Sequence, residues 1–311
     1  MTINRGRART RHISPVMVAA GIFAALLAGK VGAQDLDPRR YVNVPVGQNF
    51  AALGFVHSEG DVNVSPSVPL DDAFLSIKAT SLSYVRTMGL GGKAATFDAY
   101  VPYVCTSGSA ILDGERLRRD VCGLGDALVR FTYNFVGAPA LGMSDFIKRE
   151  KELVVGASIQ LSLPTGEYDS DYLLNIGANR WVLRPEIGIS IPRRNWSFEF
   201  AAGVRIFTDN DDYVGDVTSS QDPLYNLQAH IIYDLSPRQW LSLDANYFFG
   251  GAAYNDDVPS AIKQENSRLG ITWFVMVNPG FGLKLAAHAG VATRVGNDSD
   301  TFLLAGIYRW E

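Results

Sequence analysis

The chain has 311 residues, of which 47% are hydrophobic and 19% are charged, and its formal net charge is −4. The first 33 residues hold five of the 28 basic residues and no acidic one, so the remainder has 23 basic against 32 acidic residues. This acidic excess argues against nucleic acid as a partner, because phosphate binding needs Lys and Arg. The roughly 280 residues that remain are enough for one or two soluble domains or one large barrel.

Residues 1–33 have the features of a secretory signal peptide. Four arginines come first, residues 16–29 are apolar, and Val31-Gly32-Ala33 gives a cleavage site of small residues before Gln34. A membrane anchor is the alternative, but this apolar run is shorter than the ~20 residues that a transmembrane helix needs. No other apolar run comes closer, which excludes a helical membrane protein.

Residues 34–48 form a polar segment before the first predicted strand. Pro45 and Gly47 interrupt it, so it is unsuited to a membrane strand. Fully extended, it could reach about 50 Å into a barrel lumen, where Arg39 and Arg40 could pair with acidic residues such as Glu186 or Glu199. We therefore consider a lumen-inserted segment that plugs and gates the barrel, with a disordered periplasmic tail as the alternative.

From residue 49 onwards, apolar and polar residues alternate with a period of two, which is typical of β-strands. In 240–250, for example, Leu241 and Leu243 belong to one face while Ser242 and Asp244 belong to the other. Many of the runs have roughly the 9–11 residues that a tilted membrane-spanning strand requires. The twelve predicted strands are 49–59, 73–87, 94–104, 127–137, 152–163, 178–191, 196–207, 224–235, 240–250, 264–277, 282–294 and 301–310.

The connections between these strands alternate in length, as they do between the short periplasmic turns and long outer loops of outer-membrane barrels. The exception is 138–151, a longer turn in which 144–151 could form one or two helical turns. We therefore predict an all-β fold, an antiparallel up-and-down barrel of about twelve strands over residues 49–311. The long connections are 60–72, 105–126, 164–177, 208–223, 251–263 and 295–300.

Closure into a barrel follows from the membrane, because unpaired backbone groups cannot reach water there. Apolar faces would then contact lipid and polar faces would line the lumen. A soluble two-sheet sandwich is the alternative. Aromatic residues near strand ends suit interfacial girdles: Tyr84, Trp181, Trp196, Phe207, Trp240, Phe249, Trp273, Tyr308 and Trp310.

The hairpin at 152–191 carries a resemblance to a known family. Its loop reads Leu-Pro-Thr-Gly-Glu-Tyr-Asp at 163–169, followed by Asn-Ile-Gly-Ala-Asn-Arg-Trp at 175–181 and Arg-Pro-Glu-Ile-Gly at 184–188. These motifs, with Gly-Ala-Pro-Ala at 137–140, Gln-Asp-Pro-Leu at 221–224 and Trp-Leu-Ser-Leu-Asp at 240–244, resemble the "MetA-pathway of phenol degradation" family. The resemblance implies a bacterial outer-membrane channel for small aromatic or hydrophobic molecules, with lipid and lipopolysaccharide as surroundings.

Cys105 and Cys122 bracket one long loop. A signal peptide implies an oxidising compartment, so we predict a disulfide between them. Two free thiols are the alternative. A metal site is disfavoured because no histidine is near them in sequence.

The predicted lumen face carries charges of both signs. They could form a mutually neutralising network that holds strand register, or opposed ladders that orient a polar or anionic permeant. The candidates are Lys78, Arg86, Asp98, Arg130, Arg184, Glu186, Glu199, Arg205, His230, Asp234, Asp244, Arg268, Lys284, His288 and Arg294.

Catalytic and metal sites receive little support from the sequence. Acidic clusters in the long loops could bind a divalent ion, but they lack the spacing of a calcium loop and also suit solvated loops. Outer-membrane barrels include hydrolases, and His230 with Asp234 could form an acid–base pair. We expect neither a catalytic residue, nor a metal, nor a cofactor. The main alternative to a channel is a structural or adhesive barrel whose loops bind a partner.

Overall fold

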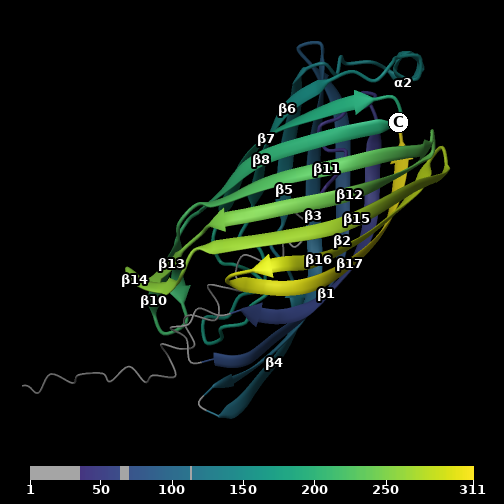
Figure 1. Ribbon diagram of the computed structural model, residues 1–311. Helices are drawn as coiled ribbons and strands as arrows, with labels where there is room; N and C mark the ends of the chain where they lie inside the picture. Colours follow the sequence, from purple (N-terminus) through teal and green to yellow (C-terminus); the bar gives the residue numbers. More distant parts are fainter. Residues whose placement is uncertain (1–35, 64–69, 113) are drawn as a thin grey trace, which may run out of the picture.

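The computed structural model describes residues 36–63, 70–112 and 114–311 (Figure 1). The predicted signal peptide, together with residues 34 and 35, lies outside the described residues. No described helix is long and apolar enough to cross a membrane.

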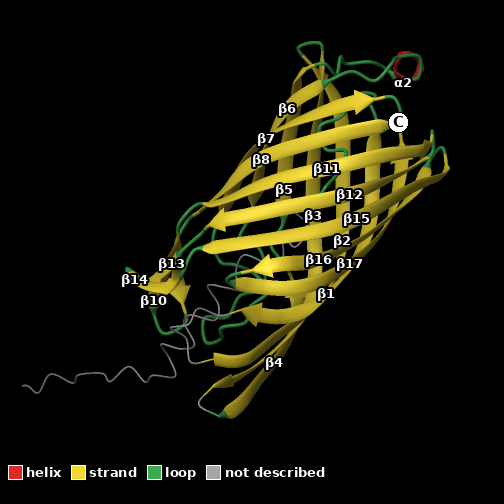
Figure 2. Ribbon diagram, in the orientation of Figure 1, coloured by secondary structure: helices red, strands yellow, loops and turns green. Residues whose placement is uncertain are grey.

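Twelve antiparallel strands close into a barrel, which confirms the predicted fold. The order round the barrel is β2-β1-β17-β16-β15-β12-β11-β8-β7-β6-β5-β3, and pairing of β2 with β3 closes it (Figures 1 and 2). These strands are β1 (Asn49–Asn63), β2 (Leu70–Leu90), β3 (Lys93–Leu112), β5 (Leu128–Val136), β6 (Val154–Ser162), β7 (Val182–Arg193), β8 (Trp196–Phe207), β11 (Leu224–Ser236), β12 (Gln239–Gly250), β15 (Gln264–Asn278), β16 (Phe281–Thr293) and β17 (Gly296–Trp310).

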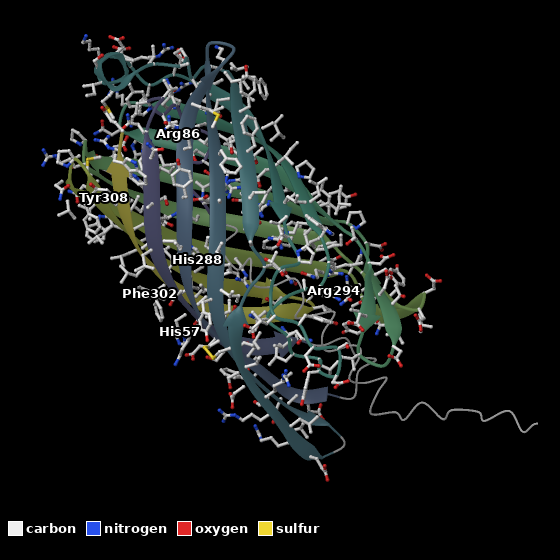
Figure 3. The ribbon with its side chains drawn as sticks, turned by 180° about the vertical axis from the view of Figure 1, so that it is seen from behind. His57, Arg86, His288, Arg294, Phe302 and Tyr308 are labelled. Carbon is white, nitrogen blue, oxygen red and sulfur yellow. A yellow bond between two sulfur atoms is a disulfide. The ribbon has the colours of Figure 1, made fainter. Side chains whose placement is uncertain are left out.

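The alternation in sequence becomes an inward and an outward face of each strand. In β12, Leu243 is 59% exposed on the outside, whereas Ser242 and Asp244 on the inside are only 1% and 2% exposed. In β17, Phe302 and Tyr308 project from the outer surface (Figure 3). An apolar exterior around a polar interior suits a barrel surrounded by lipid.

One end of the barrel, here called the turn end, has short connections, and the opposite end is called the loop end. The exception at the turn end is the connection between β5 and β6, which contains the short helix α2 (Met143–Phe146), where a helical turn was expected close by. In Figure 2 this helix lies at the top, beside the turn end.

The loop end has more strand structure than the sequence predicted. The expected loop 105–126 instead continues β3 and returns as β4 (Glu115–Leu124), which pairs with β3 alone. The hairpin projects beyond the barrel (Figure 1), and its turn includes Gly114 with a φ of 84°. The Asp-Gly pair at 113–114 was the available signal, because it favours two-residue hairpin turns. Cys105 and Cys122 are direct partners in this hairpin and form the predicted disulfide.

The expected loop 295–300 is instead the start of β17, which begins at Gly296, and two other expected loops contain strands of their own. They contribute β9 (Asn210–Tyr213), β10 (Val217–Gln221), β13 (Ala253–Asn255) and β14 (Val258–Ala261) to a separate four-stranded sheet at the loop end. The pairing of β10 with β13 joins two loops that are far apart in the sequence, and such a pairing is not visible in local periodicity.

A hydrophobic core lies inside the barrel at the loop end. Leu174 and Ile176, from the connection between β6 and β7, belong to it together with Leu75 and Ile77 of β2 and Val104 of β3. The connection is therefore folded inwards, and it buries the apolar face of β2 where lipid exposure was expected.

The aromatic residues are divided between the two faces. Tyr84 packs against Trp310 with ring centroids 6.2 Å apart, and Trp196 packs against Tyr233 at 4.6 Å, as expected for outer girdles. Phe207 and Trp240 instead line the internal cavity, so their assignment to the girdles was wrong.

Candidate functional site in the barrel lumen

An internal cavity of about 660 Å³ is enclosed by inward-facing side chains of the barrel. Apolar residues of β1 and β17 line one side, and polar residues of β5 to β8 line the opposite side. Residues 36–48, called the N-terminal segment, and part of the connection between β6 and β7 complete the lining.

The N-terminal segment enters the lumen at the turn end. The backbone N–H of Val46 donates to the carbonyl oxygen of Leu141 at 2.9 Å, and that of Gly47 donates to the carbonyl oxygen of Thr87 at 3.0 Å. The preceding residues reach the barrel interior, where the side chain of Asn134 donates to the carbonyl oxygen of Val42 at 3.1 Å.

Tyr41 fixes the segment against β6 and β7. Its buried ring lies over Gly156 and Gly188, where a Cβ atom on either residue would overlap the ring. Its hydroxyl is 3.0 Å from the Oγ of Ser158. The two glycines therefore create the space for Tyr41, a close approach that only a residue without a side chain allows.

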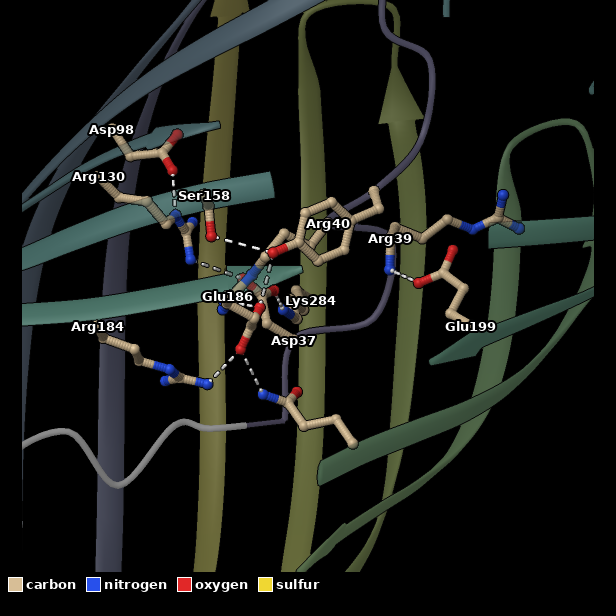
Figure 4. Close-up of polar contacts among 12 residues, drawn as sticks. Asp37, Arg39, Arg40, Asp98, Arg130, Ser158, Arg184, Glu186, Glu199 and Lys284 are labelled. Carbon is tan, nitrogen blue, oxygen red and sulfur yellow. Dashed lines mark hydrogen bonds and ion pairs between the residues drawn. The ribbon is translucent and has the colours of Figure 1, made fainter. Parts of the chain in front are cut away.

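Glu186 is the acceptor for four donors from three parts of the chain (Figure 4). Arg40 Nη1 donates to Glu186 Oε1 at 2.9 Å, and the Tyr41 hydroxyl donates to the same atom at 2.9 Å. Arg184 Nη2 and Gln228 Nε2 donate to Oε2 at 2.7 and 3.2 Å. The Glu186 side chain is 1% exposed, so its charge is stabilised by these contacts and not by bulk water.

Asp37 connects nearly opposite walls of the barrel. Its carboxylate lies 3.1 Å from Lys284 Nζ of β16 and 3.6 Å from Arg130 Nη1 of β5, and it also accepts from Arg40 Nη2 at 3.2 Å. Arg130 in turn donates to Asp98 at 2.5 Å (Figure 4). One residue of the N-terminal segment thus links charges that the barrel walls hold apart.

Arg39 attaches the segment to a third region. Its backbone N–H donates to Glu199 Oε2 at 2.7 Å, and its guanidinium donates to Asp234 Oδ1 at 2.5 Å. The guanidinium also lies over the ring of Trp240, and Lys151 pairs with the other oxygen of Asp234.

A second polar cluster lies in the wall formed by β11, β12 and β15. His230 Nδ1 is 2.7 Å from Asp244 Oδ1, and the hydroxyls of Ser242 and Thr272 donate to the same carboxylate at 2.9 and 2.7 Å. The sequence had suggested Asp234 as a partner for His230. The structure places Asp244 directly across from His230 on the neighbouring strand.

Asp126 holds the inward-folded connection at the loop end. The backbone N–H groups of Gly166 and Ala178 each donate to a different carboxylate oxygen of Asp126 at 2.9 Å. Burial raises the pKa of this carboxyl, while the backbone donors lower it. Two segments of the connection are therefore fixed to one side chain beside the cavity.

The structure places the candidate residues at three locations. Lys78 and Arg86 lie on the outer face of β2 with the exposed Leu82, because the inward-folded connection takes up the apolar face of this strand near Lys78. Arg294 lies at the rim of the loop end, where it pairs with Glu265 at 2.9 Å (Figure 3). The remaining candidates lie on the inner face: Asp98, Arg130, Arg184, Glu186, Glu199, Arg205, His230, Asp234, Asp244, Arg268, Lys284 and His288.

Sequence reasoning missed several polar residues of the lumen. Asp37 and Tyr41 belong to the N-terminal segment, and nothing in a short polar stretch reveals which wall each of them contacts. Ser158 and Gln228 were on predicted inward faces, so strand parity was a usable signal. Among the described residues, no group of His, Cys, Asp and Glu has an arrangement that could hold a metal ion.

Comparison with solved structures gives the same architecture. The COG4313 outer membrane channel from Pseudomonas putida F1 is similar with a TM-score of 0.73 and 20% identity, over 89% of this chain and all of that one. The translocator domain of the autotransporter NalP from Neisseria meningitidis has a TM-score of 0.51 at 10% identity, over 93% of this chain and 99% of that one. At these identities the likeness concerns the fold. No curated protein matches the sequence.

Family membership follows from the sequence match. The model of the "MetA-pathway of phenol degradation" family matches residues 55–305, which is most of the barrel. Together with the closed barrel and its apolar exterior, this match places the protein in the bacterial outer membrane. The chain belongs to the "MetA-pathway of phenol degradation" family.

Proposed function

We propose that the protein is a passive channel for the uptake of small hydrophobic molecules, in particular aromatic ones. The observation that carries this proposal is the cavity of about 660 Å³, a size typical of small-molecule sites, into which Phe207, Trp240 and Phe274 project. Aromatic side chains favour aromatic ligands through stacking and edge-to-face contacts. Such a channel needs neither a cofactor nor an energy source.

The N-terminal segment is proposed to be a gate. It contacts β5, β7, β8 and β16 through ion pairs and hydrogen bonds, so its position sets how much of the lumen is free. With the turn end in the periplasm, as short turns indicate, a permeant enters past the inward-folded connection, and lipopolysaccharide surrounds the loop end.

Catalysis is not part of the proposal. The His230–Asp244 pair lies in the barrel wall, away from the loop end, and Ser242 donates to Asp244 instead of contacting His230. A serine nucleophile needs a histidine within hydrogen-bond reach. The cluster is better explained as a network that fixes the register of β11, β12 and β15.

Partner binding is the second candidate function. The β3–β4 hairpin favours it, because it projects beyond the barrel (Figure 1) and presents the exposed charged residues Glu115, Arg116, Arg118 and Asp120. Replacing the exposed Glu115, Arg116 and Arg118 by serine separates the two functions, since a channel keeps its uptake rate and an adhesive barrel loses its partner.

Uptake of a panel of phenols by a strain lacking the protein and by its complemented counterpart tests the proposal. The channel predicts slower uptake in the deletion strain at low external concentration, restored by the complement. Equal rates in the two strains would refute it.

A further inference from the structure

An arginine row crosses four neighbouring strands of the lumen wall. Arg130 of β5 lies directly across from Gln160 of β6 in the sheet register, and Gln160 lies directly across from Arg184 of β7. The register between β7 and β8 places Arg205 across from Arg184, since Leu183 is paired with Ile206 and Glu186 with Gly203. All four side chains line the same cavity.

This row is unusual for a folded sheet, because like charges opposite one another on adjacent strands are destabilising. Pairing within the protein relieves part of the repulsion: Arg130 binds Asp98 at 2.5 Å, and Arg184 binds Glu186 at 2.7 Å. Glu186 is shared with Arg40, so one carboxylate faces two guanidinium groups.

More basic than acidic side chains line the cavity itself, and carboxylates just behind the lining pair with three of the basic ones: Glu186 with Arg40 and Arg184, and Asp234 with Arg39. The lining includes six basic side chains and three acidic ones among the described residues. The basic residues are Arg39, Arg40, Arg130, Arg184, Arg205 and Lys284, and the acidic residues are Asp37, Asp98 and Asp126.

The wall that faces the arginine row is apolar. β1 and β17 lie half-way round the barrel from β8 and β7, and their inward residues include Ala52, Leu303, Ala305 and Ile307. The cavity therefore lies between a wall that carries the arginine row and a wall that is apolar. A molecule that satisfies both has an apolar body and one anionic group.

We propose that the arginine row is a binding site for the carboxylate of an amphipathic permeant, whose apolar body lies against β1 and β17. This inference rests on the proposed channel function and narrows its substrate class to carboxylates with an apolar body, of which benzoate is the simplest aromatic example. Guanidinium groups suit this role because their planar donors match the geometry of a carboxylate.

Equilibrium binding to the full-length mature protein in lipid nanodiscs tests the site by calorimetry. The three probes are benzoate, its neutral isostere benzamide, and acetate, which has the charge without the ring. The wild-type protein is expected to bind benzoate about tenfold more tightly than benzamide, as charge-assisted hydrogen bonds predict, and more tightly than acetate because of the apolar wall.

Two variants of the row and one control sharpen the result. Arg205→Gln should weaken benzoate binding by about tenfold and leave benzamide binding unchanged. Gln160→Glu adds a carboxylate between Arg130 and Arg184 and should remove the preference for benzoate without creating a cavity. Arg294→Gln makes the same charge change at the rim, outside the row, and should have no effect.

Equal affinity of the wild type for benzoate and benzamide would overturn the inference, as would an equal loss of benzoate binding in Arg294→Gln. The two proposals fail separately. If cells take up phenol through the protein but benzoate is not preferred, only the carboxylate site is refuted. If benzoate is preferred but phenol uptake does not depend on the protein, the site stands and the uptake of neutral aromatics is refuted.

Discussion

The buried carboxylate of Glu186 joins the N-terminal segment to the barrel wall, and neutralising it tests how much this contact stabilises the protein. In Glu186→Gln the side chain keeps its size, but one of its two acceptor oxygens becomes an NH₂ group. The four donors are divided between the two oxygens, with Arg40 and Tyr41 on Oε1 and Arg184 and Gln228 on Oε2. At least two donors therefore lose their acceptor whichever way the amide is oriented.

The cost comes mainly from the two guanidinium groups. The side chains of Arg40 and Arg184 are 8% and 3% exposed, so water cannot replace the lost carboxylate. Removing one partner of a buried ion pair costs about 3–5 kcal/mol. We expect a loss of about 3 kcal/mol in the free energy of unfolding, at the low end of that range because the neighbouring cavity admits some solvent.

Glu199→Gln is the matched control, since Glu199 is also buried and also binds the N-terminal segment. Its contacts are with the backbone N–H of Arg39 and the hydroxyl of Ser190, so its replacement leaves no guanidinium group without its acceptor. Neutralising it should cost about 1 kcal/mol.

Urea titration of both variants in lipid vesicles, followed by tryptophan fluorescence, gives the two free energies. Single-channel conductance of Glu186→Gln should also rise, because Arg40 and Tyr41 lose a shared anchor. A destabilisation of Glu186→Gln no larger than that of Glu199→Gln would refute the reasoning.

Three further predictions concern the gate, the lipid face and the disulfide. Deleting residues 36–41 should raise the single-channel conductance in planar bilayers; an unchanged conductance would mean that the segment does not restrict the lumen. Leu243→Arg should lower the free energy of unfolding by about 2–4 kcal/mol near mid-membrane, whereas Leu235→Arg, near the turn end, should lower it by at most about 1 kcal/mol. Equal losses would contradict the assigned depth. Alkylation of the folded protein should label neither Cys105 nor Cys122 before reduction and both after it; labelling without reductant would show that the disulfide is absent.

The strands themselves were predictable from the sequence. An apolar exterior and a polar interior impose a period of two on every membrane-spanning strand, and this period is visible locally. All twelve barrel strands were therefore found, most within a few residues of their bounds, and the inward positions of Glu186 and Asp244 followed from parity. The disulfide was also predictable, because the chain has only two cysteines and begins with the features of a secretory signal.

The tertiary structure decided which charges meet and which apolar faces avoid lipid. His230 binds Asp244 and not Asp234 because partners across a strand pair depend on register, which the turns and bulges set. Lys78 lies outside because Leu174 and Ile176 fold back onto the inner face of β2, a long-range contact with no local signal. Asp37 joins β5 to β16 only after the barrel has closed, since residues so far apart in the sequence become neighbours through closure alone.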